Sequence, residues 1–406
     1  MKKVLLITPQ ALPIPAIKGG AVETLVTHLI DENENHNDVK FFIISVFDED
    51  AAQYRYKNTE IFYIQNRRFD FLCYKFISFF RKIVFNKFTK LILSKSKYGF
   101  RELTFFAYQC TRIAKRINPD IIVSESYDQI HRLWPLVKKF GNENFYYHLH
   151  YVKDANADAR KMFPNTIAIS NFVLNHWIAN SNFGKSFVVY NGIDLRAFTN
   201  NDPGDISLLR KKLGFSDNDF IVLFTGRLRP HKGVLQLLRS FEKIEDKNVK
   251  LLVVGNFLSE TNRSNKKDET TFDNECLNII NNNKQIVRVK EITYSDIPKY
   301  YSLANIQCIP SMWEEGAGLV AIEGMASGLP LIITNSGGMP EYTGTECAVI
   351  LQRDDRLLDN IAASILKLKN DKNLCKEMSE KGIERSKMFS KENYYRNYTK
   401  CILGTK

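Results

Sequence analysis

Two glutamates stand on either side of a short glycine-rich stretch in the second half of the chain. Glu315 and Glu323 are separated by seven residues, which begin with Gly316–Gly318, and a strand-like run at Ile306–Pro310 precedes them. A helix is expected from about Leu319, so the glycines lie at a helix N-terminus, where N–H groups and the helix dipole favour an anion. Ionised carboxylates only accept hydrogen bonds, and each can receive them from a diol. The stretch therefore predicts a site that holds sugar hydroxyl groups at one end, ribose at the other and phosphate between them.

Two cations lie in a turn that follows another strand-like run. Arg227 and Lys232 flank a proline-containing turn after Phe220–Thr225, with Gly226 and Gly233 outside them. Two cations at a strand end, beside the start of a helix, form a clamp for a diphosphate. Lysine and arginine are common in loops, so these two cations alone are weak evidence for a diphosphate site. The glutamates further along the chain strengthen that interpretation.

A glycine pair leads from the first predicted strand into the first predicted helix. Gly19 and Gly20 stand in the sequence IPAIKGGAVETLVTHL, where the backbone can approach a phosphate or an acceptor. The pair is not part of a GxGxxG pattern, and no acidic residue ends the second strand at the position that binds a dinucleotide. This argues against a nicotinamide-binding domain.

Two histidines end a strand-like run that reads FYYHLHY. His148 and His150 alternate along the strand, so both side chains point to the same face. Histidine acts as an acid, a base or a hydroxyl-orienting group near neutral pH. Two other interpretations stay open, a histidine buried in the core and one half of a metal site. We expect no metal, because no third ligand is nearby in the sequence.

The bulk composition suggests a folded protein with more than one core. A chain of 406 residues predicts two domains, and its net charge of +12 favours an anionic partner such as acidic lipid, nucleic acid or a phosphorylated ligand. The seven cysteines include no CxxC pair and are odd in number, which indicates a reduced, cytosolic protein. The first apolar run is too short for a signal peptide, and no run reaches the roughly 18 residues of a spanning helix.

Short β-branched or aromatic runs alternate with longer amphipathic stretches throughout the chain. This alternation predicts an α/β protein with two doubly wound, Rossmann-like parallel sheets that face each other across a cleft and bind ligands at the carboxyl ends of their strands. A polar segment with proline and glycine at 198–214 marks the best boundary. The expected strands are Val4–Thr8, Phe41–Val46, Ile121–Val123, Phe145–Leu149, Ile167–Ile169, Phe187–Tyr190, Phe220–Thr225, Leu251–Gly255, Ile286–Val289, Ile306–Pro310, Leu331–Thr334 and Ala348–Leu351. The expected helices are about Ala21–Ile30, Glu102–Ile117, Gln236–Ile244 and Leu357–Leu368.

One basic segment differs from the rest of the chain. Residues 67–101 carry ten lysines or arginines against one acid, Asp70, while Leu72, Phe76 and Phe80 recur at helical spacing. Basic residues opposite aromatic ones are typical of a helix that lies in a membrane interface. A core helix with a solvated basic face is the alternative. Nucleic-acid binding is not expected, because no recognisable nucleic-acid module accompanies the segment.

These motifs together carry a resemblance to a known family. The sequence EEGAGLVAIEGMASGLPLI, with GRLRPHKG upstream, resembles the retaining glycosyltransferases of family 4, which have the GT-B fold. VVYNGIDLRAF looks like the family's segment between domains, NSGGMPEY like the loop after the glutamates, and FSKENYYRNYTKCI like its terminal helix. The likeness covers nearly the whole chain and is strongest from Phe187 to Tyr342. It implies an acceptor-side domain at 1–185, a donor domain at 186–390, and a helix at 391–406 that packs back on the first domain.

The resemblance also implies roles for individual residues. The residues expected to act on the reacting bond are Arg227 and Lys232 on the donor diphosphate, Glu315 on the transferred sugar, and His150, with His148 as the alternate, beside that sugar. Further donor-binding residues are expected in both domains: Glu323 on the ribose, Ile292 beside the base, Gly19, Gly20 and Gly226 near the phosphates, and Gly316, Ala317, Gly318 and Leu319 along sugar and phosphate.

Two departures from the family pattern concern the donor pocket. Ala317 stands where the family usually has phenylalanine, which changes the sugar pocket, and Glu291 stands where a glycine usually ends a strand near the base. The resemblance implies retention of anomeric configuration with no metal and no cofactor, because the positive clamp replaces the charge of a metal. The nucleotide-sugar donor is expected to carry UDP.

Other functions fit parts of the pattern. A second nucleotide-sugar enzyme such as an epimerase needs no acceptor, and a non-catalytic, membrane-associated scaffold that binds nucleotide sugars needs no turnover. The basic segment at 67–101 favours a transferase, because a glycan or lipid-linked acceptor at an anionic membrane surface explains it. By analogy, we expect a cytoplasmic protein, peripheral at the inner face of the cell membrane, that builds capsule, exopolysaccharide or lipopolysaccharide.

Overall fold

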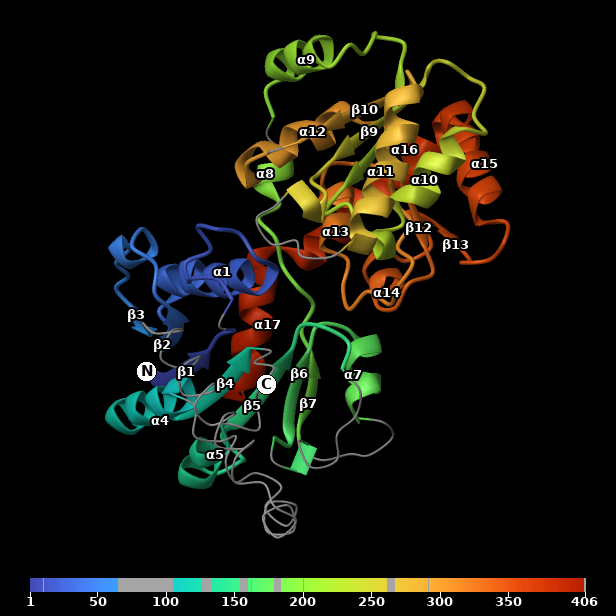
Figure 1. Ribbon diagram of the computed structural model, residues 1–406. Helices are drawn as coiled ribbons and strands as arrows, with labels where there is room; N and C mark the ends of the chain where they lie inside the picture. Colours follow the sequence, from blue (N-terminus) through green and yellow to red (C-terminus); the bar gives the residue numbers. More distant parts are fainter. Residues whose placement is uncertain are drawn as a thin grey trace. The chain divides into compact units, whose positions relative to one another are not determined.

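The computed structural model describes residues 1–9, 11–64, 105–125, 133–153, 160–161, 163–178, 184–199, 201–260, 267–290 and 292–404. The chain forms two compact units, one of Met1–Tyr190 with Tyr394–Lys406 and one of Asn191–Asn393 (Figure 1). The predicted boundary at 198–214 is therefore wrong, because that segment lies inside the second unit and contains a helix. The basic segment at 67–101 and Glu291 lie outside the described residues.

The first unit is built on a parallel sheet. In the described part of this unit, seven strands follow the order β3-β2-β1-β4-β5-β6-β7, and all neighbours pair in parallel. Their apolar runs are continuous, as expected of strands that are covered on both faces. The strands are β1 (Lys2–Ile7), β2 (Val39–Val46), β3 (Thr59–Ile64), β4 (Ile121–Glu125), β5 (Phe145–Leu149), β6 (Asn165–Ala168) and β7 (Ser186–Val188).

The core of the first unit includes a helix from the far end of the chain. Tyr394, Tyr398 and Ile402 are buried in the same apolar cluster as Val4 and Leu29, and Figure 1 shows their helix in red beside blue elements. This helix therefore completes the first unit after the chain has passed through the second. The helices are α1 (Ala21–His36), α4 (Phe105–Ile117), α5 (Trp134–Phe140), α7 (Asn171–Ile178) and α17 (Lys391–Leu403), with a 3-10 turn at Ala51–Gln53.

The second unit has a parallel sheet of the same kind. Its described residues form six strands in the order β10-β9-β8-β11-β12-β13. The strands are β8 (Phe220–Thr225), β9 (Val249–Val254), β10 (Ile286–Val289), β11 (Ile306–Ile309), β12 (Leu331–Thr334) and β13 (Ala348–Leu351). The helices are α8 (Arg196–Thr199), α9 (Pro203–Lys212), α10 (Val234–Phe241), α11 (Lys267–Asn282), α12 (Ile297–Leu303), α13 (Leu319–Ala326), α14 (Met339–Thr343), α15 (Leu357–Asn370) and α16 (Lys372–Ser386), with 3-10 turns at Pro230–Lys232, Leu258–Glu260, Tyr294–Asp296 and Lys387–Phe389. Among the helices of the described residues, none has the length and apolar character to span a membrane.

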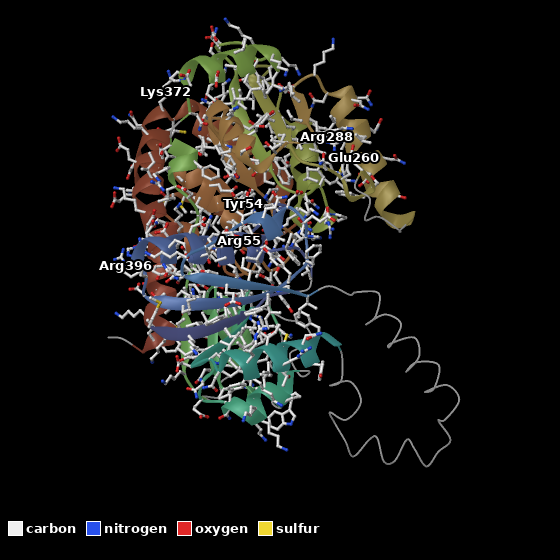
Figure 2. All side chains as sticks on the ribbon, turned by 90° about the vertical axis from the view of Figure 1, so that its left-hand side faces the viewer. Tyr54, Arg55, Glu260, Arg288, Lys372 and Arg396 are labelled. Atoms are coloured by element: carbon white, nitrogen blue, oxygen red, sulfur yellow. The ribbon has the colours of Figure 1, made fainter. Side chains whose placement is uncertain are left out.

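A buried cation fixes one loop at the edge of the second sheet. Arg288 on β10 contacts Glu260, with 3.2 Å between Nη1 and Oε1, and its guanidinium carbon lies 4.3 Å from the ring centroid of Phe257 (Figure 2). Burial opposes ionisation of Glu260, but hydrogen bonds from Arg288 and Lys290 lower its pKa to about 2. The loop after β9 is therefore held by charge as well as by packing.

Both sheets reverse their strand order at one place. The chain moves outward from β1 in one direction and resumes on its other side at β4, and it does the same at β8 and β11. The loops after such adjacent strands diverge, which leaves space at the carboxyl ends for a ligand. In each unit, most residues with predicted functions lie at the ends of strands at or beside this switch point, whereas Ile292 follows β10 at the edge of the second sheet.

Candidate active site

The switch point of the second unit brings together two motifs whose contacting residues are 83 positions apart in the sequence. Lys232 follows β8 and Glu315 follows β11, and their Nζ and Oε1 atoms are 2.7 Å apart. Ser311 donates a second hydrogen bond to the same oxygen at 2.6 Å. Glu315 is buried and Lys232 is half-buried, so this ion pair lies in a site partly shielded from water. The structure thus joins Lys232, one of the two cations of the predicted clamp, to the predicted sugar-binding carboxylate of Glu315.

Local backbone geometry places Lys232 where it meets Glu315. Lys232 ends a 3-10 turn, and Gly233 after it has φ +71° and lies so close to the Pro310 carbonyl oxygen that a Cβ would overlap that atom. The lysine ammonium also lies 5.3 Å from the ring centroid of Trp313, in cation–π range. The glycine is therefore required at this position by both its conformation and its close contact.

Arg227 and Gly226 begin the same loop. Gly226 has φ +133°, and Arg227 is exposed at the carboxyl end of β8. Arg227 therefore stands on the solvent side of the loop, whereas Lys232 stands on its buried side. The diphosphate clamp that was predicted for the two cations stays a prediction.

The glycine-rich stretch opens α13 as predicted. Gly318 is the N-cap residue of the helix, and no side chain caps it. The stretch is held from the other side by the loop after β12, where Gly338 N–H donates to the Glu315 carbonyl oxygen at 2.7 Å and Ser336 Oγ accepts from Glu315 N–H at 3.3 Å. The loop after β12 thus holds the backbone of Glu315, which directly precedes Gly316, Ala317, Gly318 and Leu319.

Glu323 is buried one turn into α13. Its Oε2 accepts a hydrogen bond of 2.6 Å from Tyr301, whose hydroxyl is 2.8 Å from Thr225 Oγ1, and Gln307 donates to that same Oγ1 at 3.2 Å. Burial raises the pKa of Glu323 to about 7, although the bond from Tyr301 opposes the rise. A carboxylate has about four lone-pair sites, so Glu323 can accept from ribose hydroxyls while Tyr301 orients it.

Ile292, predicted beside the base, is half-buried three residues after β10.

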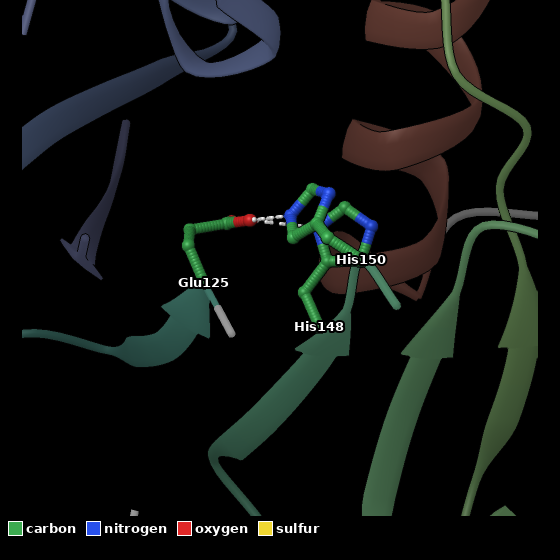
Figure 3. A group of neighbouring side chains, drawn as sticks. All are labelled: Glu125, His148 and His150. Carbon is green, nitrogen blue, oxygen red and sulfur yellow. Dashed lines mark hydrogen bonds and ion pairs between the residues drawn. The ribbon is translucent and has the colours of Figure 1, made fainter. Parts of the chain in front are cut away.

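The histidine pair of the first unit shares one carboxylate. Glu125 ends β4 and is opposite His148 on β5. Glu125 Oε2 lies 2.8 Å from His148 Nδ1 and 2.7 Å from His150 Nε2, and its Oε1 accepts from the Tyr398 hydroxyl at 2.6 Å (Figure 3). Burial opposes ionisation of Glu125, but the two imidazoles hold its pKa below the ordinary value. Burial also lowers the pKa of His150 to about 4, so this ring is neutral at pH 7.

The same three residues are a possible ligand set for a metal. Their ligand atoms all lie within 4.8 Å of one another. The reason given above against a metal is therefore wrong, because a third group comes from the neighbouring strand. However, nitrogen–oxygen distances of 2.7 and 2.8 Å are those of hydrogen bonds. Two ligand atoms on one tetrahedral zinc, each about 2.0–2.1 Å from the ion, stand roughly 3.3 Å apart. The geometry favours two imidazoles that donate to a shared oxygen, and the absence of a metal stays a prediction.

The glycine pair at the start of α1 adopts a conformation that other residues avoid. Gly19 has φ +69° and Gly20, the N-cap residue of α1, has φ +103°. Glu23 lies buried beneath Gly20, so a Cβ on that glycine would overlap the carboxylate. Burial raises the pKa of Glu23. The predicted approach of this backbone to a phosphate stays a prediction.

Several residues that build these sites escaped the sequence analysis. Glu125 carried a usable signal, since it ends a buried strand at the same sheet edge as the histidines. Ser311 also follows a strand at the switch point. Tyr301 and Tyr398 carry no local signal, because both are aromatic residues at helical spacing, like many core residues.

Two parallel sheets of this topology, each with polar residues at its switch point, define the GT-B fold. Anabaena HepE, solved in complex with UDP and glucose, shares that fold over 100% of both chains with a TM-score of 0.71 and 18% sequence identity. Residues 205–385 match the family described as Glycosyl transferases group 1. Within residues 205–385, the resemblance found in the motifs is thereby confirmed at the level of group 1, and family 4 stays a prediction.

Two relatives of known name each match about half of the chain. One is a GDP-mannose-dependent monoacylated alpha-(1-6)-phosphatidylinositol monomannoside mannosyltransferase of Corynebacterium glutamicum, 28% identical over 188 residues that make up 44% of this chain and 46% of that protein. The other is the capsular polysaccharide biosynthesis glycosyltransferase CapM of Staphylococcus aureus, 32% identical over 230 residues, or 54% of this chain and 56% of that protein. The chain spans about half the length of these relatives.

Proposed function

We propose that this protein is a glycosyltransferase that moves a sugar from a nucleotide-sugar donor to a glycan or lipid-linked acceptor. The observation that carries the proposal is the Lys232–Glu315 pair, which lies at the switch point of a unit that matches the group 1 glycosyl transferases. An ammonium suits a diphosphate and a carboxylate suits sugar hydroxyls. A bound donor can therefore separate the pair, with its diphosphate on Lys232 and its sugar on Glu315.

In the proposed reaction, the bond between the anomeric carbon and the diphosphate breaks while a bond to the acceptor oxygen forms. Negative charge builds on the leaving diphosphate, where Lys232, Arg227 and the N-terminus of α13 stabilise it more in the transition state than in the ground state. The leaving phosphate takes the proton of the acceptor hydroxyl, so the step needs no dedicated base. In this proposal, His150 acts beside the reacting sugar, with His148 as the alternate.

The finer features of this proposal are retention of anomeric configuration, independence of metal ions and a UDP-linked donor. The UDP in the HepE complex supports the choice of base, while the GDP-mannose named for the C. glutamicum relative supports the alternative. The biological setting is assembly of a bacterial surface polysaccharide, which the name of CapM supports. An epimerase or a non-catalytic scaffold is the competing function, and neither would join a labelled sugar to an acceptor.

We also propose a cytoplasmic protein that binds the inner face of the cell membrane through residues 67–101. The support is compositional, with ten basic residues against one acid and aromatic residues between them. Neutralising Arg81, Lys82, Lys87 and Lys90 is expected to weaken binding to vesicles that contain anionic lipid. Unchanged binding would favour the core-helix interpretation of the segment.

The first test of the transferase proposal is the thermal midpoint measured against a panel of UDP, GDP and their sugar conjugates with a chelator present. Binding to the folded state raises the midpoint by mass action. A rise with one base, reduced in Arg227→Ala and kept in Glu314→Gln, supports a donor site at this switch point. Glu314 is a suitable control, because it is a neighbouring exposed carboxylate that pairs with Arg353. No rise with any nucleotide in folded protein would contradict the proposal.

A further inference from the structure

We propose that Glu125 is a positioning residue, which fixes the tautomer and ring orientation of both histidines, and that Tyr398 on the last helix holds Glu125 in place. This inference rests on the proposed function, since it concerns the histidines expected beside the reacting sugar. It names a role for a carboxylate and a tyrosine that no sequence motif marks.

Both carboxylate oxygens of Glu125 have hydrogen-bond partners. Its carboxylate is fully buried, and a buried carboxylate needs donors on its oxygens. One oxygen lies within 2.8 Å of a nitrogen on each imidazole, and the other accepts from Tyr398. Figure 3 shows Glu125 reaching across from β4 to both rings. All three neighbours must therefore act as donors toward one ionised group.

The two histidines contact Glu125 through different ring nitrogens. His148 contacts Glu125 through Nδ1 and His150 through Nε2, so the carboxylate places the protons on different nitrogens of the two rings. When such a ring is neutral, its other nitrogen carries the lone pair, which is Nε2 in His148 and Nδ1 in His150. The ring centroids are 4.0 Å apart at an interplanar angle of 45°. One carboxylate thus fixes two tautomers and keeps two rings in contact.

Helix α17 completes the arrangement around Glu125. Tyr398 is buried on α17, and burial together with Glu125 raises the pKa of its hydroxyl well above the ordinary value, so the hydroxyl stays a donor. Its ring centroid also lies 5.6 Å from that of His148. The helix at the end of the chain therefore contacts both the carboxylate and one of the rings that it orients.

The chemical consequence is a dependence of turnover on Glu125 without contact between Glu125 and the substrate. A histidine presents either a proton or a lone pair to a hydroxyl group, and the carboxylate behind it decides which. Loss of such a carboxylate leaves the ring in place but with the wrong tautomer, and in enzymes built this way turnover falls by orders of magnitude. Donor binding in the second unit needs none of these groups.

The test combines kinetics with the tautomers themselves. In protein labelled with ¹⁵N-histidine, long-range proton–nitrogen correlation spectra of the wild type are expected to show an Nδ1–H tautomer for His148 and an Nε2–H tautomer for His150. Glu125→Gln is expected to change at least one of these signals and to lower kcat by about 100-fold, with the donor KM within about threefold of wild type. The nucleotide-induced rise in thermal midpoint should be retained.

Two tyrosines on α17 supply a matched pair of variants. Tyr398→Phe removes the donor to Glu125 and is expected to lower kcat about tenfold. Tyr395→Phe removes the hydroxyl that lies 2.9 Å from Asn33 Oδ1 and is expected to leave kcat unchanged. Because both changes remove one buried hydroxyl from the same helix, an equal effect on kcat would indicate a general loss of structure and overturn the proposal.

Other outcomes are equally decisive. Wild-type protein with the opposite tautomers would overturn the inference even if Glu125→Gln does not fold. The inference would also be overturned if Glu125→Gln kept the wild-type tautomers and a kcat within about twofold of the wild type. The stated tautomers in a protein that binds no nucleotide and transfers no sugar would instead overturn the proposed function, and with it the role of Glu125 in turnover.

Discussion

Binding of a nucleotide sugar is expected to expel a proton from Glu323. In the unliganded protein, burial raises the pKa of this carboxyl to about 7, and its Oε2 accepts from Tyr301. The hydroxyls of a ribose donate hydrogen bonds, and such donors favour the ionised carboxylate. The bound state therefore has a lower pKa than the unliganded state, and a protonated Glu323 must ionise before it binds the ribose in full.

The size of this effect follows from the pKa. A group with a pKa near 7 is about nine-tenths protonated at pH 6, half protonated at pH 7 and about one-tenth protonated at pH 8. If the bound carboxyl is ionised throughout this range, then binding releases about 0.9, 0.5 and 0.1 proton at these three values of pH. The apparent affinity is expected to weaken about tenfold between pH 8 and pH 6, or about 1.4 kcal/mol.

Calorimetric titration in pairs of buffers with different ionisation enthalpies measures the released protons directly. UDP-glucose is a suitable ligand, because its diester phosphates do not titrate in this range. Glu323→Gln keeps the shape of the side chain and an acceptor for Tyr301 but cannot ionise, so its proton release should be close to zero. Subtracting the proton release of the variant from that of the wild type removes the protons that come from other groups. One such group is His231, because burial lowers its pKa. Equal proton release in both proteins would refute the assignment of ribose binding to Glu323.

The same pKa has a consequence for folding stability. The pKa of Glu323 in the folded protein lies above the ordinary value of 4.5, so the folded state binds more protons than the unfolded state between pH 4.5 and about 7. This contribution to the free energy of unfolding is therefore present below pH 4.5 and is lost as pH rises through that window. Between pH 4.5 and pH 8, the free energy of unfolding of the wild type, measured in urea, is expected to fall by about 3 kcal/mol more than that of Glu323→Gln. A difference between the two proteins that does not change with pH would contradict the raised pKa.

Three further predictions concern the Lys232 loop and the chemistry of the site. Lys232→Met and Glu315→Gln are each expected to lower kcat about 100-fold or more while Glu314→Gln keeps normal rates, and equal initial rates in all three would contradict the site. Gly233→Ala is expected to lower the free energy of unfolding by about 3 kcal/mol or more, measured in urea, because the Pro310 carbonyl oxygen occupies the place of the new Cβ. A chelator is expected to leave the transfer rate unchanged, whereas a loss that added magnesium restores would contradict independence of metals.

The sheets could be predicted from the sequence because their strands are continuous apolar runs separated by amphipathic stretches. β3 was not predicted from the sequence. Its apolar residues lie between polar ones, and the last four residues of the strand are only half-buried. Helix α1 was expected to end near Ile30, but it continues to His36 through a polar stretch. Asn33 in that stretch is buried, and its side chain donates to the Val39 carbonyl oxygen at 2.9 Å. Tertiary contacts of this kind override the polar character that suggested a loop.

The candidate site could be predicted where its residues lie directly after strands. Lys232 and Glu315 each follow a strand, and adjacent strands of a parallel sheet bring such residues to one edge. The partner of the histidines was not predicted, although Glu125 also ends a strand, because it lies 23 positions before His148 and only the pairing of β4 with β5 brings the two together. The bond from Tyr398 to Glu125 joins residues 273 positions apart, and nothing local in the sequence specifies it.

The discontinuous first unit has a consequence for biosynthesis. Its sheet emerges from the ribosome before the second unit, but its core stays open until Tyr394, Tyr398 and Ile402 have been translated. The second unit is continuous in sequence and has its own core, so it can fold first even though it is made later. The nascent first unit must therefore keep an apolar surface exposed for the whole time needed to synthesise the second, and a pause or premature stop late in translation leaves that surface uncovered.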